Sequence, residues 1–178
     1  MYILASKSPR RQELLKLLID DFIIEVSNVD ESLIKDEPYN LSATLSKAKA
    51  EEIFKRHPED IVIAADTIVI HKNKILGKPK DSDDAFKMLK ELSGDEHDVI
   101  TGFTILSKDK CITKSVLTKV HFNTLSDELI KAYVQTGSPF DKAGAYGIQD
   151  KEFPLIKKIE GSYYNVMGLP VEELKKCL

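Results

Sequence analysis

Short apolar runs along this chain predict the strands of a sheet. The run at residues 61–65 is continuous, which is typical of a strand buried on both faces, and it resumes beyond Asp66 and Thr67. The polar stretch at residues 27–39 predicts a loop. The strands are expected at residues 2–5, 22–26, 61–70, 99–106 and 112–122.

Between these runs, apolar residues recur at helical spacing. Ser8 suits the N-cap of a first helix and Pro9 its first helical position. A second helix is expected over residues 41–56, with Leu45, Ala48 and Ile53 facing inward.

Two more helices follow the same rules. Ser82 or Asp83 would cap a third helix that Gly94 stops, and Ser126 would cap a fourth that ends before Gly137. Strands and helices in this mixture predict an α/β sheet flanked by helices.

Length and composition narrow the class of protein. The chain has 178 residues and a mass of 20.0 kDa, which suits one large domain or two small lobes around one cleft. Hydrophobic residues make up 42% and charged residues 31%, which excludes a disordered or low-complexity chain. The net charge of −3 argues against a general nucleic-acid or membrane-surface binder.

Other sequence features bear on location and cofactors. No apolar stretch is long enough to span a bilayer, and the N-terminus lacks the layout of a signal peptide. Cys111 and Cys177 form no CxxC pair, so reduced thiols in a cytoplasmic protein are expected. The four histidines have no zinc-ligand spacing.

The turn between the first strand and the first helix is a candidate anion site. Ser6 and Ser8 offer hydroxyl donors there, and Arg10 and Arg11 offer charge and bidentate geometry for phosphate. The chain contains only three arginines, and two of them are adjacent here, which favours an anion site over ordinary surface charge. The alternative is a capped, solvated helix start.

Two acidic positions form a second candidate. Asp66 lies within a long apolar run, where a carboxylate must be paired, bound to a metal or placed at a cleft. With the loop residues Asp30 and Glu31 it would offer oxygen ligands to Mg²⁺ or Mn²⁺. The alternatives are a strand-end carboxylate held by backbone N–H groups and a solvated acidic pair.

The remaining candidate functional residues are lysines, two of them near glycine or proline, and one glycine-rich segment. Lys78, Lys142 and Lys49 would add positive charge, although a lysine is usually solvated surface. In the segment 143–149, a tyrosine between two glycines with a nearby amide would stack on and hydrogen-bond a base. Together these features indicate a nucleotide site and leave open which bond is broken.

The sequence resembles the Maf family, the septum-formation proteins that act as nucleoside triphosphate pyrophosphatases. The opening block, residues 4–15, matches the family signature, and further blocks follow in the family's order. These lie at residues 45–50, 65–67, 77–79, 92–94, 101–102, 141–149 and 161–170.

The resemblance implies an elongated mixed sheet flanked by helices, with two lobes around a central cleft, like the inosine triphosphate pyrophosphatases. It implies a homodimer and hydrolysis of a nucleoside triphosphate to the monophosphate and pyrophosphate with a divalent metal. Asp66 matches the proposed proton acceptor. The segment 141–149 resembles the subfamily acting on dTTP and UTP, in which Arg10, Thr67 and Gln149 are linked to substrate choice.

Roles for the candidate residues follow from this resemblance. Asp66, Glu31 and Lys78 are expected to be catalytic, with Glu31 and Asp66 holding the metal. Gln149 would read the pyrimidine edge. The substrate-binding set is expected to be Ser8, Arg10, Arg11, Lys49, Thr67, Lys142 and Gln149.

One departure from the family pattern concerns the base pocket. Family members commonly continue after the position of Gln149 with a glycine-rich stretch, and here residues 150–154 read Asp-Lys-Glu-Phe-Pro. Three alternatives stay open: a pyrophosphatase for another or modified nucleotide, a nucleotide-binding regulator of cell division without turnover, and a purely structural domain.

Overall fold

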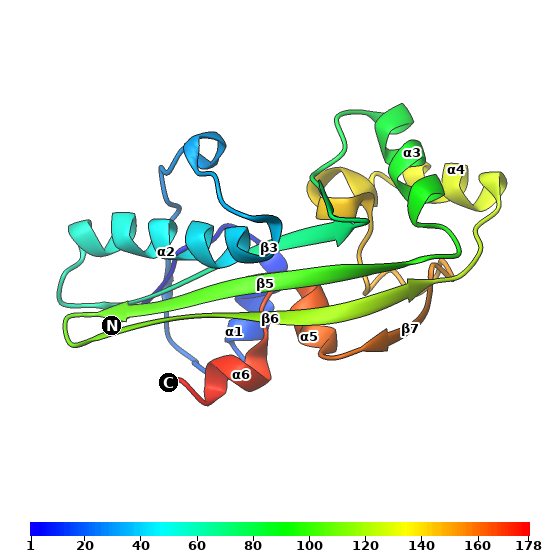
Figure 1. Ribbon diagram of the computed structural model, residues 1–178. Helices are drawn as coiled ribbons and strands as arrows, with labels where there is room; N and C mark the ends of the chain where they lie inside the picture. Colours follow the sequence, from blue (N-terminus) through cyan, green and yellow to red (C-terminus); the bar gives the residue numbers. More distant parts are fainter. The chain divides into compact units, whose positions relative to one another are not determined.

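The computed structural model describes residues 1–178 and confirms a mixed α/β fold with a seven-stranded mixed sheet (Figure 1). The strand order is β2-β1-β3-β5-β6-β7, with β4 paired to β3. β1 is parallel to β2 and β3, whereas the pairs β3–β4 and β6–β7 are antiparallel. The strands are β1 (Tyr2–Leu4), β2 (Ile23–Ile24), β3 (Ile61–His71), β4 (Lys74–Leu76), β5 (Glu96–Ser107), β6 (Lys110–Phe122) and β7 (Ile156–Glu160).

Six α-helices and three short 3₁₀ helices connect the strands. The α-helices are α1 (Pro9–Leu15), α2 (Pro38–Arg56), α3 (Ser82–Leu92), α4 (Asp127–Gln135), α5 (Tyr163–Met167) and α6 (Val171–Lys175). The 3₁₀ helices are η1 (Glu31–Leu33), η2 (Ser138–Asp141) and η3 (Ala143–Ala145). None of the helices is both long and apolar enough to cross a membrane.

The chain forms two compact units. Unit 1 consists of Met1–Thr67, Ile100–Val116 and Tyr164–Leu178, and unit 2 of Ile68–Val99 and Leu117–Tyr163. Strands β3, β5 and β6 therefore contribute residues to both. The expectation of an elongated domain with two lobes around one cleft stays a prediction.

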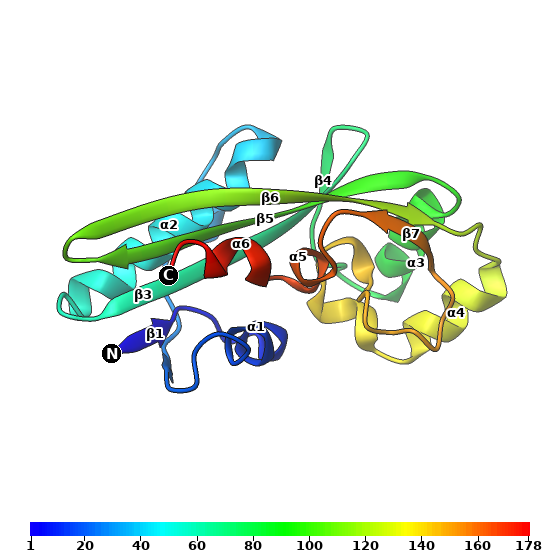
Figure 2. The ribbon, with the colours of Figure 1, turned by 90° about the horizontal axis from the view of Figure 1, so that it is seen from below.

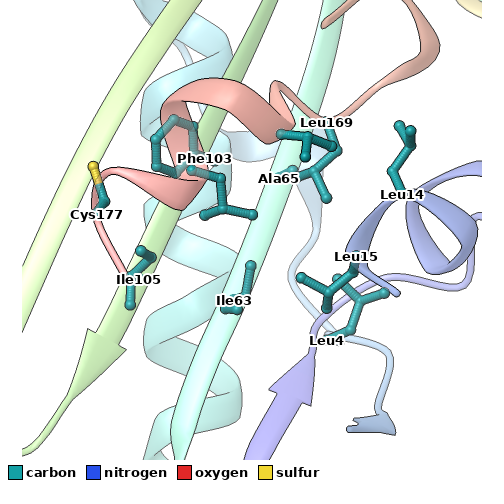
Figure 3. Packing of buried hydrophobic residues seen from close by; sticks show 11 residues of the cluster. Leu4, Leu14, Leu15, Ile63, Ala65, Phe103, Ile105, Leu169 and Cys177 are labelled. Atoms are coloured by element: carbon teal, nitrogen blue, oxygen red, sulfur yellow. The ribbon is translucent and has the colours of Figure 1, made fainter. Parts of the chain in front are cut away.

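The core of unit 1 follows from the alternation of side chains along its strands. Leu4, Ile63 and Ala65 belong to one buried cluster, which residues of α1 and α6 complete (Figure 3). The intervening positions Val62 and Ala64 belong to a second cluster, which residues of α2 complete. Figure 2 shows α6 on the near side of the sheet and α2 behind it. Both faces of β3 are thus buried, as its continuous apolar run predicted.

Most element boundaries in unit 1 match the sequence pattern. The Ser8 side chain caps α1 by accepting from the Arg11 N–H, and Pro9 is the first helical residue, as expected. The predicted loop at 27–39 is wrong at its end, because Pro38 starts α2 three residues earlier than expected. Ala50, rather than the half-buried Ala48, fills the inner face of α2.

The contact between α2 and β5 has no space for a side chain at Gly102. A Cβ there would lie 2.3 Å from the backbone N of Ala43 and 2.4 Å from the carbonyl C of Ser42. Both atoms belong to the first turns of α2. Gly102 therefore sets the distance between this helix and the sheet.

In unit 2, α3 and α4 lie beside one another (Figure 1). The cap of α3 is Asp81, whose side chain accepts from the N–H of Asp84 at 2.8 Å, so the expected caps Ser82 and Asp83 are wrong by one or two residues. Ser126 caps α4 as expected. Gly94 and Gly137 take the left-handed conformation just after these helices, with φ of 70° and 78°.

A buried histidine connects the β3–β4 turn to the end of α3. The two ring nitrogens of His71 lie 2.9 Å from Glu91 Oε1 and 3.0 Å from Asp95 Oδ2. The hydrogen bond from His71 lowers the pKa of Asp95 to about 2, so that carboxylate stays charged at neutral pH.

Candidate active site

A lysine joins two carboxylates in unit 1. Asp66, on β3, is 8% exposed, and its Oδ1 lies 2.8 Å from Lys49 Nζ. The same ammonium lies 2.9 Å from Oε1 of Glu31, the first residue of η1. Asp66 is therefore a paired carboxylate, one of the alternatives that its apolar surroundings required. The structure brings together three of the residues predicted from the sequence.

The next residue of β3, Thr67, points to the opposite face of the sheet. Asp66 contacts α2 through Lys49, on the side of Val62 and Ala64. Thr67 instead contacts Arg11 of α1 and the carbonyl of Gly168. Neighbouring residues of one strand thus serve two separate groups of side chains.

Arg11 is held by protein groups along its whole guanidinium. Its Nε donates to the Gly168 carbonyl at 2.8 Å, Nη1 to Ser6 Oγ at 3.3 Å and Nη2 to Thr67 Oγ1 at 3.0 Å. Burial lowers the pKa of Arg11, and the charge of Asp66 opposes this shift. Arg11 therefore connects the β1–α1 turn to the segment before α6, in addition to supplying charge.

The hydroxyl of Thr67 is fully used by this arrangement. Thr67 Oγ1 accepts from Arg11 and lies 2.9 Å from Thr101 Oγ1. Thr101 donates its one proton to the carbonyl of Asn165 at 3.0 Å, so the Thr67 proton belongs to the 2.9 Å contact with Thr101 rather than to the 3.5 Å contact with the Gly168 carbonyl. The arginine and the carbonyl at the two ends fix the direction of this chain of hydrogen bonds.

Replacing Thr101 with Val is expected to destabilise the protein by about 1–2 kcal/mol, because the Thr67 proton and the Asn165 carbonyl lose their partner inside the core. Chemical denaturation measures the change. Thr101→Ser keeps the hydroxyl and is expected to stay close to wild type. A Thr101→Val variant as stable as wild type would contradict a stabilising role for the hydrogen bonds of the Thr101 hydroxyl.

The residues of the expected anion site lie in the turn before α1. Ser8 is committed to its cap and also donates its N–H to Ser6 Oγ at 3.3 Å. Arg10 is half-buried beside it, and its charge contributes to lowering the pKa of Arg11. Ser8, Arg10 and Arg11 lie together at this helix start, and their binding of an anion stays a prediction.

Unit 2 holds the remaining predicted residues. Lys78 is exposed, and the preceding Gly77 carbonyl accepts from the N–H of Gly144 at 3.1 Å. Lys142 Nζ donates to the Ser138 carbonyl at 2.7 Å and to Asp141 Oδ1 at 2.9 Å. The segments around Lys78 and Lys142 are therefore held against each other.

Gln149 differs from the two lysines, because its Oε1 atom is buried and has no hydrogen-bond partner. A buried amide oxygen without a partner is costly, so this atom needs a donor that the chain does not supply here. A cavity of about 210 Å³ adjoins this segment, and its lining consists of residues 147, 148, 150, 151 and 153–156, without Gln149.

The interpretation of the tyrosine between two glycines as a base-stacking residue is wrong. Tyr146 is 5% exposed, and its hydroxyl lies 2.6 Å from Nε2 of the buried His97. Its ring packs edge-on against that of Phe122, with 4.8 Å between the two ring centroids. Burial lowers the pKa of His97 to about 3, so this contact is neutral. Tyr146 is a core residue under the segment that carries Gln149.

The sequence alone did not identify several residues of these hydrogen-bond networks as functional candidates. Thr101 lies in a matched family block but showed no chemistry of its own. Tyr133, Ser138 and Asp150 form a hydrogen-bonded group beside Gln149. The only sequence signal for that group was the departure from the family pattern that begins at Asp150.

The fold places this chain in a known structural class. A solved structure of the Staphylococcus aureus Ham1 protein is similar with a TM-score of 0.55 and 13% sequence identity, covering 99% of this chain and 96% of that one. This likeness confirms the inosine triphosphate pyrophosphatase-like fold that the resemblance implied.

Within that class, the model of the Maf-like protein family matches residues 1–178, and the chain belongs to this family. Three relatives, each named dTTP/UTP pyrophosphatase, are similar over almost the whole chain. That of Thermosipho africanus is 54% identical over 97% of this chain and 88% of its own length. Those of Pyrococcus furiosus and Carboxydothermus hydrogenoformans are 52% and 50% identical, over 99% and 98% of this chain and 93% and 95% of their own.

Proposed function

We propose that this chain hydrolyses dTTP and UTP to the nucleoside monophosphate and pyrophosphate. The carrying observation is the buried Asp66 carboxylate, which Lys49 holds with Glu31, in a chain 54% identical to a protein named dTTP/UTP pyrophosphatase. Charged groups held in place on a rigid strand and helix are the means by which phosphoryl-transfer enzymes achieve most of their rate.

The reaction is an attack of water on the α-phosphorus. The water oxygen forms a bond to phosphorus, the bond to the bridging oxygen of the β-phosphate breaks, and pyrophosphate leaves with that electron pair. Asp66 takes the proton of the water. Lys49 keeps Asp66 in one orientation through the 2.8 Å contact and offsets negative charge beside it.

Positively charged groups would bind the phosphates. Arg10 and the turn at Ser8 would bind the triphosphate, while Arg11, tied to Ser6, Thr67 and Gly168, keeps that turn in place. In unit 2, Lys78 and Lys142 would supply further positive charge to the phosphates.

A divalent cation fits the donor set in unit 1. Glu31 and Asp66 already share one cation, the Lys49 ammonium, and carboxylate oxygens suit Mg²⁺ or Mn²⁺. No group of three or more His, Cys, Asp or Glu side chains forms a closed metal cage. Glu31 and Asp66 would therefore hold the ion together with substrate oxygens, and when bound it would offset charge on the phosphates.

The base would be read by Gln149. Its buried Oε1 atom lacks a donor, and the N3–H of thymine or uracil is such a donor. The amide N–H₂ would then face a carbonyl of the same base edge. This pairing favours thymine and uracil over cytosine, whose N3 carries no proton.

The test is pyrophosphate release from a panel of canonical and modified triphosphates with Mg²⁺ or Mn²⁺. The largest kcat/KM is expected for dTTP and UTP, and a chelator is expected to abolish release. A higher kcat/KM for another triphosphate would contradict the role of Gln149 only. Release from none would contradict the proposed activity and favour a binding protein without turnover.

Location and assembly belong to the same proposal. The free thiols Cys111 and Cys177 accord with a cytoplasmic enzyme. A homodimer is the assembly implied by the family resemblance, and light scattering of the purified protein tests it.

A further inference from the structure

One carboxylate in unit 2 anchors the loop that carries two predicted substrate-binding residues, Lys142 and Gln149. Asp150 Oδ2 accepts from the Tyr133 hydroxyl at 2.6 Å and from Ser138 Oγ at 2.5 Å. Tyr133 belongs to α4 and Ser138 to η2. A single oxygen atom therefore ties together the two ends of the segment 138–150.

The carboxylate also fixes the direction of the next hydrogen bonds. A carboxylate only accepts, so both hydroxyls donate to Asp150 and turn their lone pairs outward. Tyr133 then accepts from the N–H of Gly147 at 3.0 Å, and Ser138 accepts from Lys142 Nζ at 3.0 Å. Burial and the Asp150 carboxylate raise the pKa of Tyr133, which keeps its hydroxyl protonated.

Packing leaves the segment little freedom. A Cβ at Gly147 would lie 2.7 Å from Lys142 Cε and 3.1 Å from Asp150 Oδ2, so the lysine stem, the glycine and the carboxylate are in close contact. The backbone N–H of Asp150 donates to the Gly147 carbonyl at 3.1 Å, which closes a tight turn over Gln149. The position of the Gln149 amide thus follows from the anchoring of Gly147 and Asp150.

We propose that Asp150 is a positioning residue that sets the preference for thymine and uracil. Through Tyr133 and Gly147 it holds the backbone that aims Gln149. Through the Ser138 hydroxyl it orients one of three acceptors of the Lys142 ammonium, beside the Ser138 carbonyl and Asp141. This inference rests on the proposed function. It gives a role to the first residue at which the chain departs from the glycine-rich pattern of its family.

The two arms of the network act on different parts of the substrate. The arm through Tyr133 reaches Gly147 and Gln149, and therefore the base. The arm through Ser138 reaches Lys142, and therefore the phosphates, which all triphosphates share. Substitution at Tyr133 should change discrimination between bases, and substitution at Ser138 should change affinity for every triphosphate alike.

The experiment compares Asp150→Ala, Asp150→Asn, Tyr133→Phe and Ser138→Ala with wild type, using dTTP, UTP and dCTP. For Asp150→Ala we expect KM for dTTP and UTP to rise about tenfold, kcat to change much less, and the dTTP-over-dCTP preference to fall. Asp150→Asn keeps an acceptor oxygen and is expected to restore most of the preference. Tyr133→Phe should lower the preference, and Ser138→Ala should raise KM equally for all three.

A matched control separates positioning from general destabilisation. Asp95→Asn weakens another carboxylate contact of unit 2, with His71, and is expected to lower thermal stability without changing the base preference. Amide hydrogen exchange gives a readout independent of turnover: the Gly147 N–H should exchange faster in Asp150→Ala than in wild type or Asp95→Asn.

The outcomes distinguish this inference from the proposed function. An active wild type whose base preference and Gly147 exchange are unchanged in Asp150→Ala would overturn the positioning role alone. An equal loss of kcat for every triphosphate in Asp150→Ala would also overturn it. A wild type that releases pyrophosphate from no triphosphate would overturn the proposed function, and the exchange rate at Gly147 would still report whether Asp150 holds the segment.

Discussion

Replacing Asp66 with Asn is expected to lower kcat for dTTP by a factor of about 10³–10⁴ and to leave the fold intact. Asn has nearly the same shape and still offers an oxygen to Lys49 Nζ, now 2.8 Å from the carboxylate. It takes no proton from water and brings no negative charge. The loss should therefore appear in turnover, measured as pyrophosphate release at saturating dTTP.

The control is a carboxylate of the same unit that lies outside the candidate site. Asp60 pairs with the N-terminal ammonium at 3.0 Å, and Asp60→Asn is expected to keep wild-type turnover. Circular dichroism of both variants checks folding. Wild-type kcat in Asp66→Asn would remove Asp66 from the chemistry and leave the proton acceptor unassigned.

Replacing Gly102 with Ala is expected to destabilise the protein by about 3 kcal/mol, near the top of the range for overpacked cores. The added Cβ would lie 2.3 Å from the backbone N of Ala43, and neither a helix backbone nor the middle of a buried strand moves easily. The melting temperature should fall by roughly 10 °C in a chain of this length.

Gly77 supplies the matched comparison for this prediction. A Cβ at Gly77 meets no atom within 4 Å, and its φ is not positive, so Gly77→Ala is expected to leave the melting temperature nearly unchanged. Calorimetry on the two variants isolates the steric effect from the loss of a glycine as such. Equal melting temperatures for Gly102→Ala and wild type would show that α2 moves away from β5 at little cost.

The sequence predicted the fold where one local signal dominated. The apolar run of β3 and the Ser8-Pro9 start of α1 needed no tertiary information. Strand β7 was missed because lysine and glutamate interrupt its apolar positions, so period-2 patterning is weak there. Helices α5 and α6 have five residues each, too few to show a helical period.

The candidate site was predictable in its residue types but not in its pairings. The assignment of Lys49 to phosphate binding stays a prediction. Its ammonium contacts Asp66 and Glu31, 17 and 18 positions away in the chain, and the sequence did not predict this pairing. Arg11 reaches the carbonyl of Gly168, 157 residues later. Such contacts depend on which elements the topology places together, and no spacing within the sequence reports them.

The opposite orientations of Asp66 and Thr67 restrict how this strand can evolve. Substitutions within β3 change one side chain at a time, and each of the two residues can be adjusted without moving the other. An insertion or deletion of one residue before Asp66 would exchange their faces, moving the hydroxyl to the face of Lys49 and the carboxylate to the face of Arg11. A one-residue change in length there would therefore cost the contacts with Lys49 and with Arg11 together, whereas a replacement costs one of them.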